Sequence, residues 1–350
     1  MKKVTMHQIA ERVGVSKFSV SQALSGKPGV SEETRMRIVR AANDLGYSMK
    51  TKSLRRENSS GSDFIGETSV SKGTVIILMP NVRFQSRESL FWGRIIDGVS
   101  VALAEREVGV MMVTEGYSDR ALKSINPDGV LGLIGIGYIA TNLLLEIRYL
   151  DIPFVLVDHE DALVPSDSVY MNNYDSMRQM TSLVLQKGYH DIRFAGNPEY
   201  SRSFHDRWLG FRMVMEEAGL HVPKPEEDPF LQMEEHAYLI VDREIPKLVS
   251  EGKLPSAFIC ANDFFAYLIL KSLVANGVKV PEEVAVTGFD HTDEERDPTL
   301  PSLSTIHVPN ETLGRRAVEI LFHRLANPNR PFEKTMLHGA LLLRDSFKKD

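Results

Sequence analysis

Apolar residues in the first 47 positions recur every three or four residues, a spacing that predicts three short amphipathic helices. Thr5 and Gln8 form a capping-box pair at the start of the first helix, and Gly14 ends it. The second helix begins at Ser16 and the third at Ser31, both good N-cap residues. Two helices joined by a tight turn and braced by a third are typical of a helix-turn-helix, which reads the major groove of DNA.

Downstream of residue 73 the pattern changes to short apolar runs that alternate with amphipathic helices. The runs that predict buried strands cover residues 75–79, 108–113, 130–134, 154–157, 192–195, 257–260 and 284–287. The predicted helices between them cover residues 90–106, 174–187, 207–218, 264–276 and 310–325. Strands that alternate with helices predict parallel sheets covered on both faces. We therefore expect a small all-α headpiece followed by an α/β body with two similar halves.

Residues 57–73 separate these two regions and are polar and rich in serine and glycine, as in a flexible linker. The predicted domains are therefore a headpiece with its hinge (1–56), a linker (57–73) and a body (74–350).

The distribution of charged residues follows the same division. Residues 1–60 contain 12 Lys and Arg against 5 Asp and Glu, and the remainder contains 29 against 42. A basic segment on an acidic body suits a module that neutralises phosphate.

The cysteine and hydropathy content points to the cytoplasm. Cys260 is the only cysteine, which excludes an intrachain disulfide and favours a reducing compartment. Residues 1–10 contain no long apolar stretch, and no apolar run reaches the roughly 18 residues that a membrane span needs. We expect a cytoplasmic protein with no membrane partner.

The second predicted helix presents a polar face opposite Val20. Residues at the start of such a helix reach base edges, so the candidates for base readout are Lys17, Phe18, Ser21 and Gln22. Gln22 suits adenine, Lys17 suits guanine, and the Phe18 ring suits a thymine methyl group. The hydroxyl side chains at or beside the helix starts are candidates for phosphate contacts: Thr5, Ser16, Ser19, Ser31 and Thr34. Each of these hydroxyls also suits an ordinary N-cap, and Phe18 also suits a partly buried core position.

The headpiece carries a specific set of caps, turn glycines and core residues: Val4-Thr5, Ile9-Ala10, Val13-Gly14-Val15-Ser16, Val20-Ser21, Leu24, Gly26, Val30-Ser31, Thr34-Arg35 and Leu45-Gly46-Tyr47. This set resembles the headpiece of the lac-repressor-like (LacI/GalR) family without a gap. Segments of the body also resemble that family: Arg207-Trp208-Leu209-Gly210-Phe211, Ala261-Asn262-Asp263, Gly288-Phe289-Asp290 and Leu303-Ser304-Thr305-Ile306.

The resemblance implies a periplasmic-binding-protein-like body of two α/β lobes with parallel sheets and a ligand cleft between them. The expected N-terminal lobe covers residues 74–171 and 306–336, and the C-terminal lobe covers 172–305 and 337–350. It also implies a homodimeric transcriptional regulator that binds a pseudo-palindromic DNA operator. The expected role is repression of carbohydrate-utilisation genes, under the control of a sugar-like effector. No cofactor is implied.

Arg207, Asn262 and Asp290 match effector-binding positions of the family, at strand ends or an adjoining helix, where ligands bind in open α/β sheets. Asp158 is similarly placed, at the end of the strand 154–157. A sugar also needs an aromatic wall against its C–H faces, for which the candidates are Phe91, Trp92 and Phe230. Phe91 and Trp92 also suit the start of a core helix, Asp290 a cap, and Arg207 a surface ion pair.

Three departures from the family pattern are visible. Gln22 stands where family members usually carry arginine, which implies an unusual operator half-site. The family hinge, with its wedging leucine, is replaced by a segment whose minor-groove or backbone candidates are Lys50, Lys52, Leu54, Arg55 and Arg56. Residues 114–127 leave room for only a very short helix at an edge that helps to form the family dimer.

An alternative interpretation comes from a second motif. The strand 130–134 leads into G-x-G-x-x-A, formed by Gly135, Gly137 and Ala140, and the next strand ends at Asp158. This spacing is typical of a dinucleotide fingerprint and would favour a nicotinamide-dependent oxidoreductase or a redox-sensing regulator. The unit does not open the fold, however, and no catalytic Tyr/Lys pair accompanies it. His159 beside Glu160 and Asp161 suggests a metal, but adjacent acidic residues in a loop are more often solvated, so no metal is expected.

Overall fold

The computed structural model describes residues 5–24, 30–31, 34, 37–38, 41, 73–79, 90–114, 129–292 and 297–347. The chain divides into two compact units, Met1–Thr68 and Ser69–Asp350. The hinge candidates Lys50, Lys52, Leu54, Arg55 and Arg56 lie outside the described residues, as do nearly all of the expected linker and of the segment 114–127. The predicted fold class, an α-helical headpiece and a two-lobed α/β body, is confirmed.

The headpiece contains the first two predicted helices, α1 (Met6–Val13) and α2 (Lys17–Leu24). Gly14 ends α1 in the left-handed conformation, with φ of 73°, which a residue without a Cβ adopts at little cost. Among the described residues of the unit, the buried apolar side chains form a small core: Ile9, Ala10, Val20, Ala23, Ile38 and Ala41. This core fixes which face of α2 points away from the unit.

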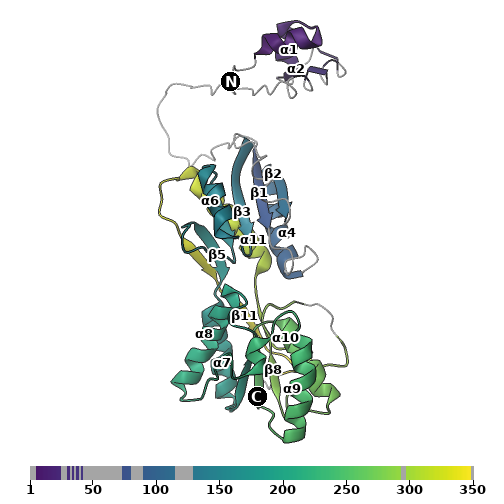
Figure 1. Ribbon diagram of the computed structural model, residues 1–350, viewed down its shortest axis with the longest axis vertical. Coiled ribbons are helices and arrows are strands. Elements are labelled where there is room, and N and C mark those ends of the chain that lie inside the picture. The colour runs from purple at the N-terminus through teal and green to yellow at the C-terminus, as the bar shows by residue number, and fades with distance from the viewer. Residues whose placement is uncertain are drawn as a thin grey trace. The chain divides into compact units, whose positions relative to one another are not determined.

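The first lobe of the body is built on a six-stranded sheet with the order β10-β5-β4-β3-β1-β2, in which every pairing is parallel. Its strands are β1 (Thr74–Met79), β2 (Gly109–Thr114), β3 (Val130–Ile136), β4 (Phe154–Val157), β5 (Asp167–Met171) and β10 (Lys334–Leu337). Figure 1 shows helices on both sides of this sheet. They are α4 (Leu90–Ala104), α6 (Thr141–Tyr149) and α11 (Asn310–Ala326).

Alternating side chains of the central strand β1 bury two separate cores. Ile77 packs into the cluster that contains α4 and α11, whereas Ile76 and Leu78 pack with the apolar face of α6. A strand buried on both faces needs an unbroken apolar run. This need explains the sequence Val-Ile-Ile-Leu-Met in β1.

The second lobe has a parallel sheet with the order β6-β7-β8, formed by β6 (Ile192–Ala195), β7 (Ala257–Cys260) and β8 (Ala285–Thr287). Its helices pack as two pairs (Figure 1): α7 (Asn173–Gln186) with α8 (Arg202–Glu217), and α9 (Ala237–Glu251) with α10 (Asp263–Ala275). A short 3-10 helix, η2 (Pro229–Gln232), lies beside β6 and α9. Helix α8 begins five residues earlier than the sequence predicts, because the Ser201 hydroxyl accepts from Phe204 N at 3.2 Å and caps it.

Three chain segments connect the two lobes within the described body. They follow β5, β9 (Thr305–His307) and β10. Strand β9 pairs antiparallel with β11 (Ala340–Leu342), and β10 pairs with β5. The pairing therefore keeps residues 306–307 with the second lobe and residue 337 with the first, one or two residues from the expected lobe boundaries.

Candidate ligand cavity and nucleic-acid interface

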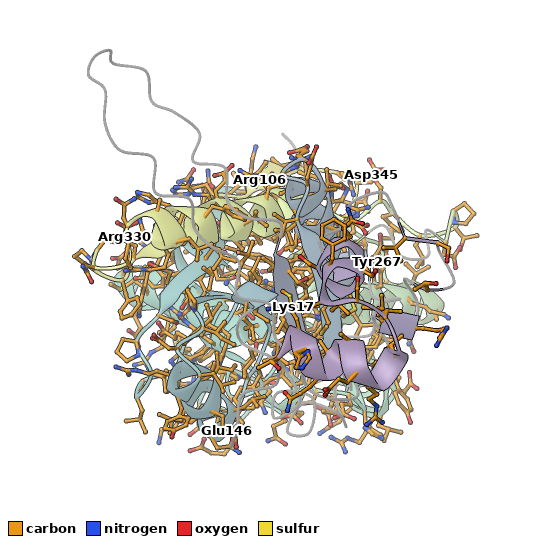
Figure 2. The ribbon with its side chains drawn as sticks, turned by 90° about the horizontal axis from the view of Figure 1, so that it is seen from above. Lys17, Arg106, Glu146, Tyr267, Arg330 and Asp345 are labelled. Carbon is orange, nitrogen blue, oxygen red and sulfur yellow. The ribbon has the colours of Figure 1, made fainter. Side chains whose placement is uncertain are left out.

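One face of helix α2 is exposed to solvent. The Phe18 side chain is 71% exposed, which is unusual for a large aromatic residue, and Lys17 and Ser21 are also exposed. Gln22 is half-buried. Lys17, labelled in Figure 2, begins the helix. The structure therefore brings the four base-readout candidates together on one helix and leaves Phe18 outside the core.

The hydroxyl candidates lie at the helix starts. Ser16 Oγ accepts from Ser19 N at 3.0 Å, and Ser31 Oγ accepts from Thr34 N at 3.3 Å. At α1, Gln8 Oε1 accepts from the Thr5 backbone N–H at 2.8 Å. Thr5, Ser16 and Ser31 are exposed, whereas Ser19 and Thr34 are half-buried. Capping and an exposed N-terminal turn are compatible with a phosphate contact at the same position.

A cavity of about 610 Å³ opens in the body, with walls from both lobes. The first lobe contributes the start of α4 and the loops that follow β3 and β4. The second lobe contributes the start of α8, the segment before α9, the start of α10 and the loop that follows β8. Six of the seven effector candidates line this cavity: Phe91, Trp92, Asp158, Arg207, Asn262 and Asp290. The carboxyl ends of the strands meet here, where open α/β sheets bind ligands.

Arg207 organises the second-lobe wall and is only 3% exposed. Its Nη2 donates to Asp290 Oδ1 at 2.9 Å, its Nε donates to Asn173 Oδ1 at 2.8 Å, and its Nη1 donates to the Ala261 carbonyl at 2.5 Å. The guanidinium carbon also lies 3.6 Å from the centre of the Phe289 ring. A guanidinium held on several sides presents its remaining N–H groups in a fixed direction.

Two acidic residues of the wall have backbones in the left-handed region, with φ of 54° at Asp158 and 102° at Asp290. Burial raises the pKa of Asp158 to about 7, against the opposing effect of Arg207, and the charge of Asp290 raises it further. Burial also raises the pKa of Asp290, while Arg207 lowers it. Unusual backbone geometry and shifted pKa values at one cavity are typical of a functional site.

The amide of Asn262 has a structural role at the same wall, because its Oδ1 accepts from Phe265 N at 2.9 Å and caps α10. The next residue, Asp263, is a supporting residue that the sequence interpretation missed. It accepts from Thr305 Oγ1 at 2.6 Å and from Thr292 N at 2.9 Å, and burial raises its pKa to about 8. Its position after a helix cap was the available signal, but the partners are remote in sequence.

Aromatic rings enter the cavity from both lobes. Phe91 and Trp92 of the first lobe are in edge contact, with ring centres 4.9 Å apart. Phe264 of the second lobe also lines the cavity and is 53% exposed, although the sequence interpretation did not select it. Phe230 does not line the cavity: it is fully buried against Phe258, because η2 packs it onto the sheet of the second lobe.

An ion-pair cluster that was not anticipated joins the lobes at the cavity. Arg202 of α8 lies 3.0 Å from Glu160 of the first lobe and covers the Tyr170 ring at 4.2 Å. Asp206 holds the other side of the guanidinium at 3.4 Å, and Lys334 also donates to Glu160. We call these five residues the lobe bridge. Its members come from four separate segments of the chain, so sequence spacing does not reveal it.

The geometry argues against the dinucleotide interpretation. A Cβ on Gly135 would lie 2.3 Å from the Ile139 side chain, so this glycine serves core packing and offers no open approach to a pyrophosphate. The three residues of the metal alternative, which the sequence did not favour, have separate partners. His159 bonds the Ile139 carbonyl, Glu160 belongs to the lobe bridge, and Asp161 accepts from Thr141. No helix within the described residues is long and apolar enough to cross a membrane.

Two family models match the chain. Residues 5–49 match the model of bacterial regulatory proteins of the lacI family, and residues 182–347 match a periplasmic binding protein-like domain. A curated relative, the HTH-type transcriptional repressor PurR of Vibrio parahaemolyticus, is 26% identical over 99% of both chains.

Solved structures of the same architecture include a transcriptional regulator CelR-cellobiose complex, with a TM-score of 0.66 and 23% identity over 98% of this chain and 100% of that one. They also include the lac repressor dimer bound to operator and the anti-inducer ONPF, with a TM-score of 0.64 and 18% identity over 99% of both chains. At these identities the structures support the fold.

Proposed function

We propose that this chain, whose residues 5–49 match the lacI family of bacterial regulatory proteins, is a sequence-specific DNA-binding regulator that acts as a homodimeric repressor of carbohydrate-utilisation genes. The headpiece reads a half-site through Lys17, Phe18, Ser21 and Gln22. Two copies bind the two halves of a pseudo-palindromic operator, since protein symmetry matches operator symmetry.

A saccharide effector in the body cavity controls operator affinity in this proposal. The observation that carries it is the meeting of Arg207, Asp290 and Asn262 at one wall, opposite Phe91 and Trp92. Polar groups of fixed direction bind ring hydroxyls, and aromatic faces cover C–H groups. The cleft is formed by two lobes, so a ligand that touches both favours one lobe arrangement and shifts the population competent for DNA binding. The protein binds this ligand without transforming it.

The test uses the full chain and DNA selected from a random library as its binding site. Arg207→Ala is expected to retain DNA affinity and to abolish the effect of saccharide on it, measured by fluorescence anisotropy. Arg212→Ala is the matched control, because Arg212 lies on the same helix and forms an exposed ion pair with Glu216 outside the cavity wall. An unchanged saccharide response in Arg207→Ala would contradict the proposed site.

A second variant protects this test against simple misfolding, since Arg207 is buried. Asn262→Ser keeps an oxygen that caps α10 and removes the amide N–H groups. We expect it to keep the thermal stability of the body and to weaken saccharide binding about tenfold, which corresponds to the loss of roughly 1.4 kcal/mol.

A further inference from the structure

The charged side chains of the cavity wall are mostly acidic. Among the described residues that line it, the carboxylates are Asp158, Glu234, Glu235 and Asp290, and the permanent cations are Arg202 and Arg207. No lysine lines the cavity in the described part of the chain. The low-dielectric walls of a cleft focus the electrostatic field inside it. The excess of acidic over basic side chains therefore affects which ligands bind.

Both guanidinium groups lie within ion-pair distance of carboxylates, although Arg202 Nη1 makes no hydrogen bond to the described residues. Arg207 is bound by Asp290 at 2.9 Å and stacked on Phe289. Arg202 lies between Glu160 at 3.0 Å and Asp206 at 3.4 Å. A ligand carboxylate or phosphate would therefore compete with protein carboxylates for each cation, and would leave a protein charge poorly paired.

The other carboxylates of the wall, Asp158, Glu234 and Glu235, repel an anionic ligand when they are ionised. Burial is the main cause of the raised pKa of Asp158; the Arg207 charge lowers it, and the neighbouring Asp290 charge raises it by a smaller amount. At the rim, Glu234 accepts from Asn197 Nδ2 at 2.5 Å, and Glu235 is exposed. Burial raises the pKa of the adjacent Tyr200 to about 12, and Glu235 and Glu234 raise it further.

The same wall is well suited to hydroxyl groups. An ionised carboxylate only accepts hydrogen bonds, and a sugar hydroxyl supplies the donor without bringing a charge. The rings of Phe91, Trp92 and Phe264 enter from opposite lobes and offer faces for the C–H side of a sugar ring. The volume of about 610 Å³ lies well inside the range of small-molecule sites, roughly 300–1,000 Å³.

We infer that the effector is a saccharide without an acidic group, and that Asp158, Glu235 and Asp290 select it by excluding uronic acids and sugar phosphates. This inference rests on the proposed saccharide effector and names its charge class. The selection works by repulsion as much as by attraction, since specificity is a difference between two affinities.

Matched sugars that differ by one acidic group test the inference on the full chain. The probes are glucose with glucuronate and glucose 6-phosphate, galactose with galacturonate, and cellobiose with cellobiose 6-phosphate, titrated by thermal shift and calorimetry at low salt. A neutral member is expected to bind saturably, with its acidic counterpart at least about tenfold weaker. Tighter binding of an acidic member overturns the charge inference alone. Binding of neither member of any pair overturns the saccharide effector itself and the inference with it.

Removal of one rim charge provides the second test. Glu235→Gln is expected to improve the affinity for the acidic counterpart of the best neutral probe by about threefold at low salt, and salt should screen the gain. Glu226→Gln is the matched control, because it makes the same change of charge at an exposed residue outside the cavity wall. Equal effects of the two variants would show that net charge, and not the cavity, governs exclusion.

Discussion

Arg207 connects three distant parts of the body through one side chain. Its partners are Asn173 at the start of α7, the carbonyl of Ala261 after β7, and Asp290 after β8. Removal of one member of a buried charged pair leaves the other uncompensated, which costs more than the pair contributes. The ligand wall and the fold of the second lobe therefore share a residue, and mutations in this wall require paired controls.

Base selection by Gln22 is a prediction at the scale of one side chain. Gln22→Ala should lose about 1–3 kcal/mol of binding on the preferred DNA and relax the preference at one base pair. Lys52→Ala, in the expected hinge, should weaken all sequences alike and lower the salt dependence of binding. Both are measured by anisotropy over a set of single-base variants and salt concentrations. Equal losses on every sequence for both variants would refute the base-readout role of Gln22.

The raised pKa of Asp263 predicts a pH dependence of stability. The folded pKa of about 8 lies above the ordinary value of 3.8, so the folded chain holds a proton that the unfolded chain has released in this range. The stabilisation is complete below pH 3.8 and is lost as the pH rises toward 8, with a slope of at most about 1.4 kcal/mol per pH unit for one proton. Asp158, with a pKa of about 7, acts in the same direction.

The measurement is the melting temperature of the full chain between pH 5 and pH 8. Asp263→Asn should flatten its decline, and this slope is informative even if the variant is less stable at every pH. Glu226→Gln, at an exposed position, should keep the wild-type slope. A wild-type slope in Asp263→Asn would contradict the assignment.

At the scale of elements, α4 and α11 pack more closely than ordinary side chains allow. A Cβ on Gly98 would lie 2.1 Å from the Glu311 carbonyl oxygen, and a Cβ on Gly314 would lie 2.1 Å from the Ile95 carbonyl oxygen. Both obstacles are backbone atoms, so the helices themselves would have to separate. The two glycines thus set the distance between α4, which carries Phe91, and α11, which follows the chain segment that leads from β9 into the first lobe.

Gly314→Ala is therefore expected to destabilise the body by about 1–3 kcal/mol through overpacking, despite the better helix propensity of alanine. Gly129→Ala is the control, because no heavy atom lies within 4 Å of the added Cβ. Guanidinium unfolding followed by circular dichroism measures both. A stabilised Gly314→Ala would mean that the helices tolerate a wider separation.

At the scale of the whole body, the lobes are joined by three chain segments and by the lobe bridge. The bridge side chains are partly exposed, with 28% for Arg202 and 34% for Glu160. Partly exposed ion pairs contribute only about 1 kcal/mol or less. Such a contribution is small for folding but large enough to change the balance between two lobe arrangements several-fold.

Arg202→Gln should consequently loosen the lobes without unfolding either of them. We expect a larger radius of gyration by small-angle scattering and a saccharide affinity about two- to fivefold weaker, because the closed cavity becomes less populated. Arg212→Gln removes an exposed ion pair within α8 and should change neither quantity. An unchanged radius and affinity in Arg202→Gln would exclude a role of the bridge in closure.

The amino-acid sequence by itself determined the elements whose signal is local. Caps and apolar spacing located α1 and α2, and continuous apolar runs located the central strands, because a strand buried on both faces needs such a run. The strands β5, β9, β10 and β11 were not predicted, since they are short or contain polar residues and are held mainly by pairing with remote partners. Tertiary contacts outweighed their local preference.

The same distinction applies to the cavity. The motif positions Arg207, Asn262 and Asp290 were selected from the sequence because they match effector-binding positions of the family that the chain resembles, at strand ends or an adjoining helix, where parallel topology gathers polar groups. Only the tertiary structure decided that Phe230 belongs to the core, that Phe264 faces the cavity, and that Arg202 bridges the lobes to Glu160. The physical reason is that burial and charge pairing depend on which remote segments meet in space, and no local periodicity encodes that meeting.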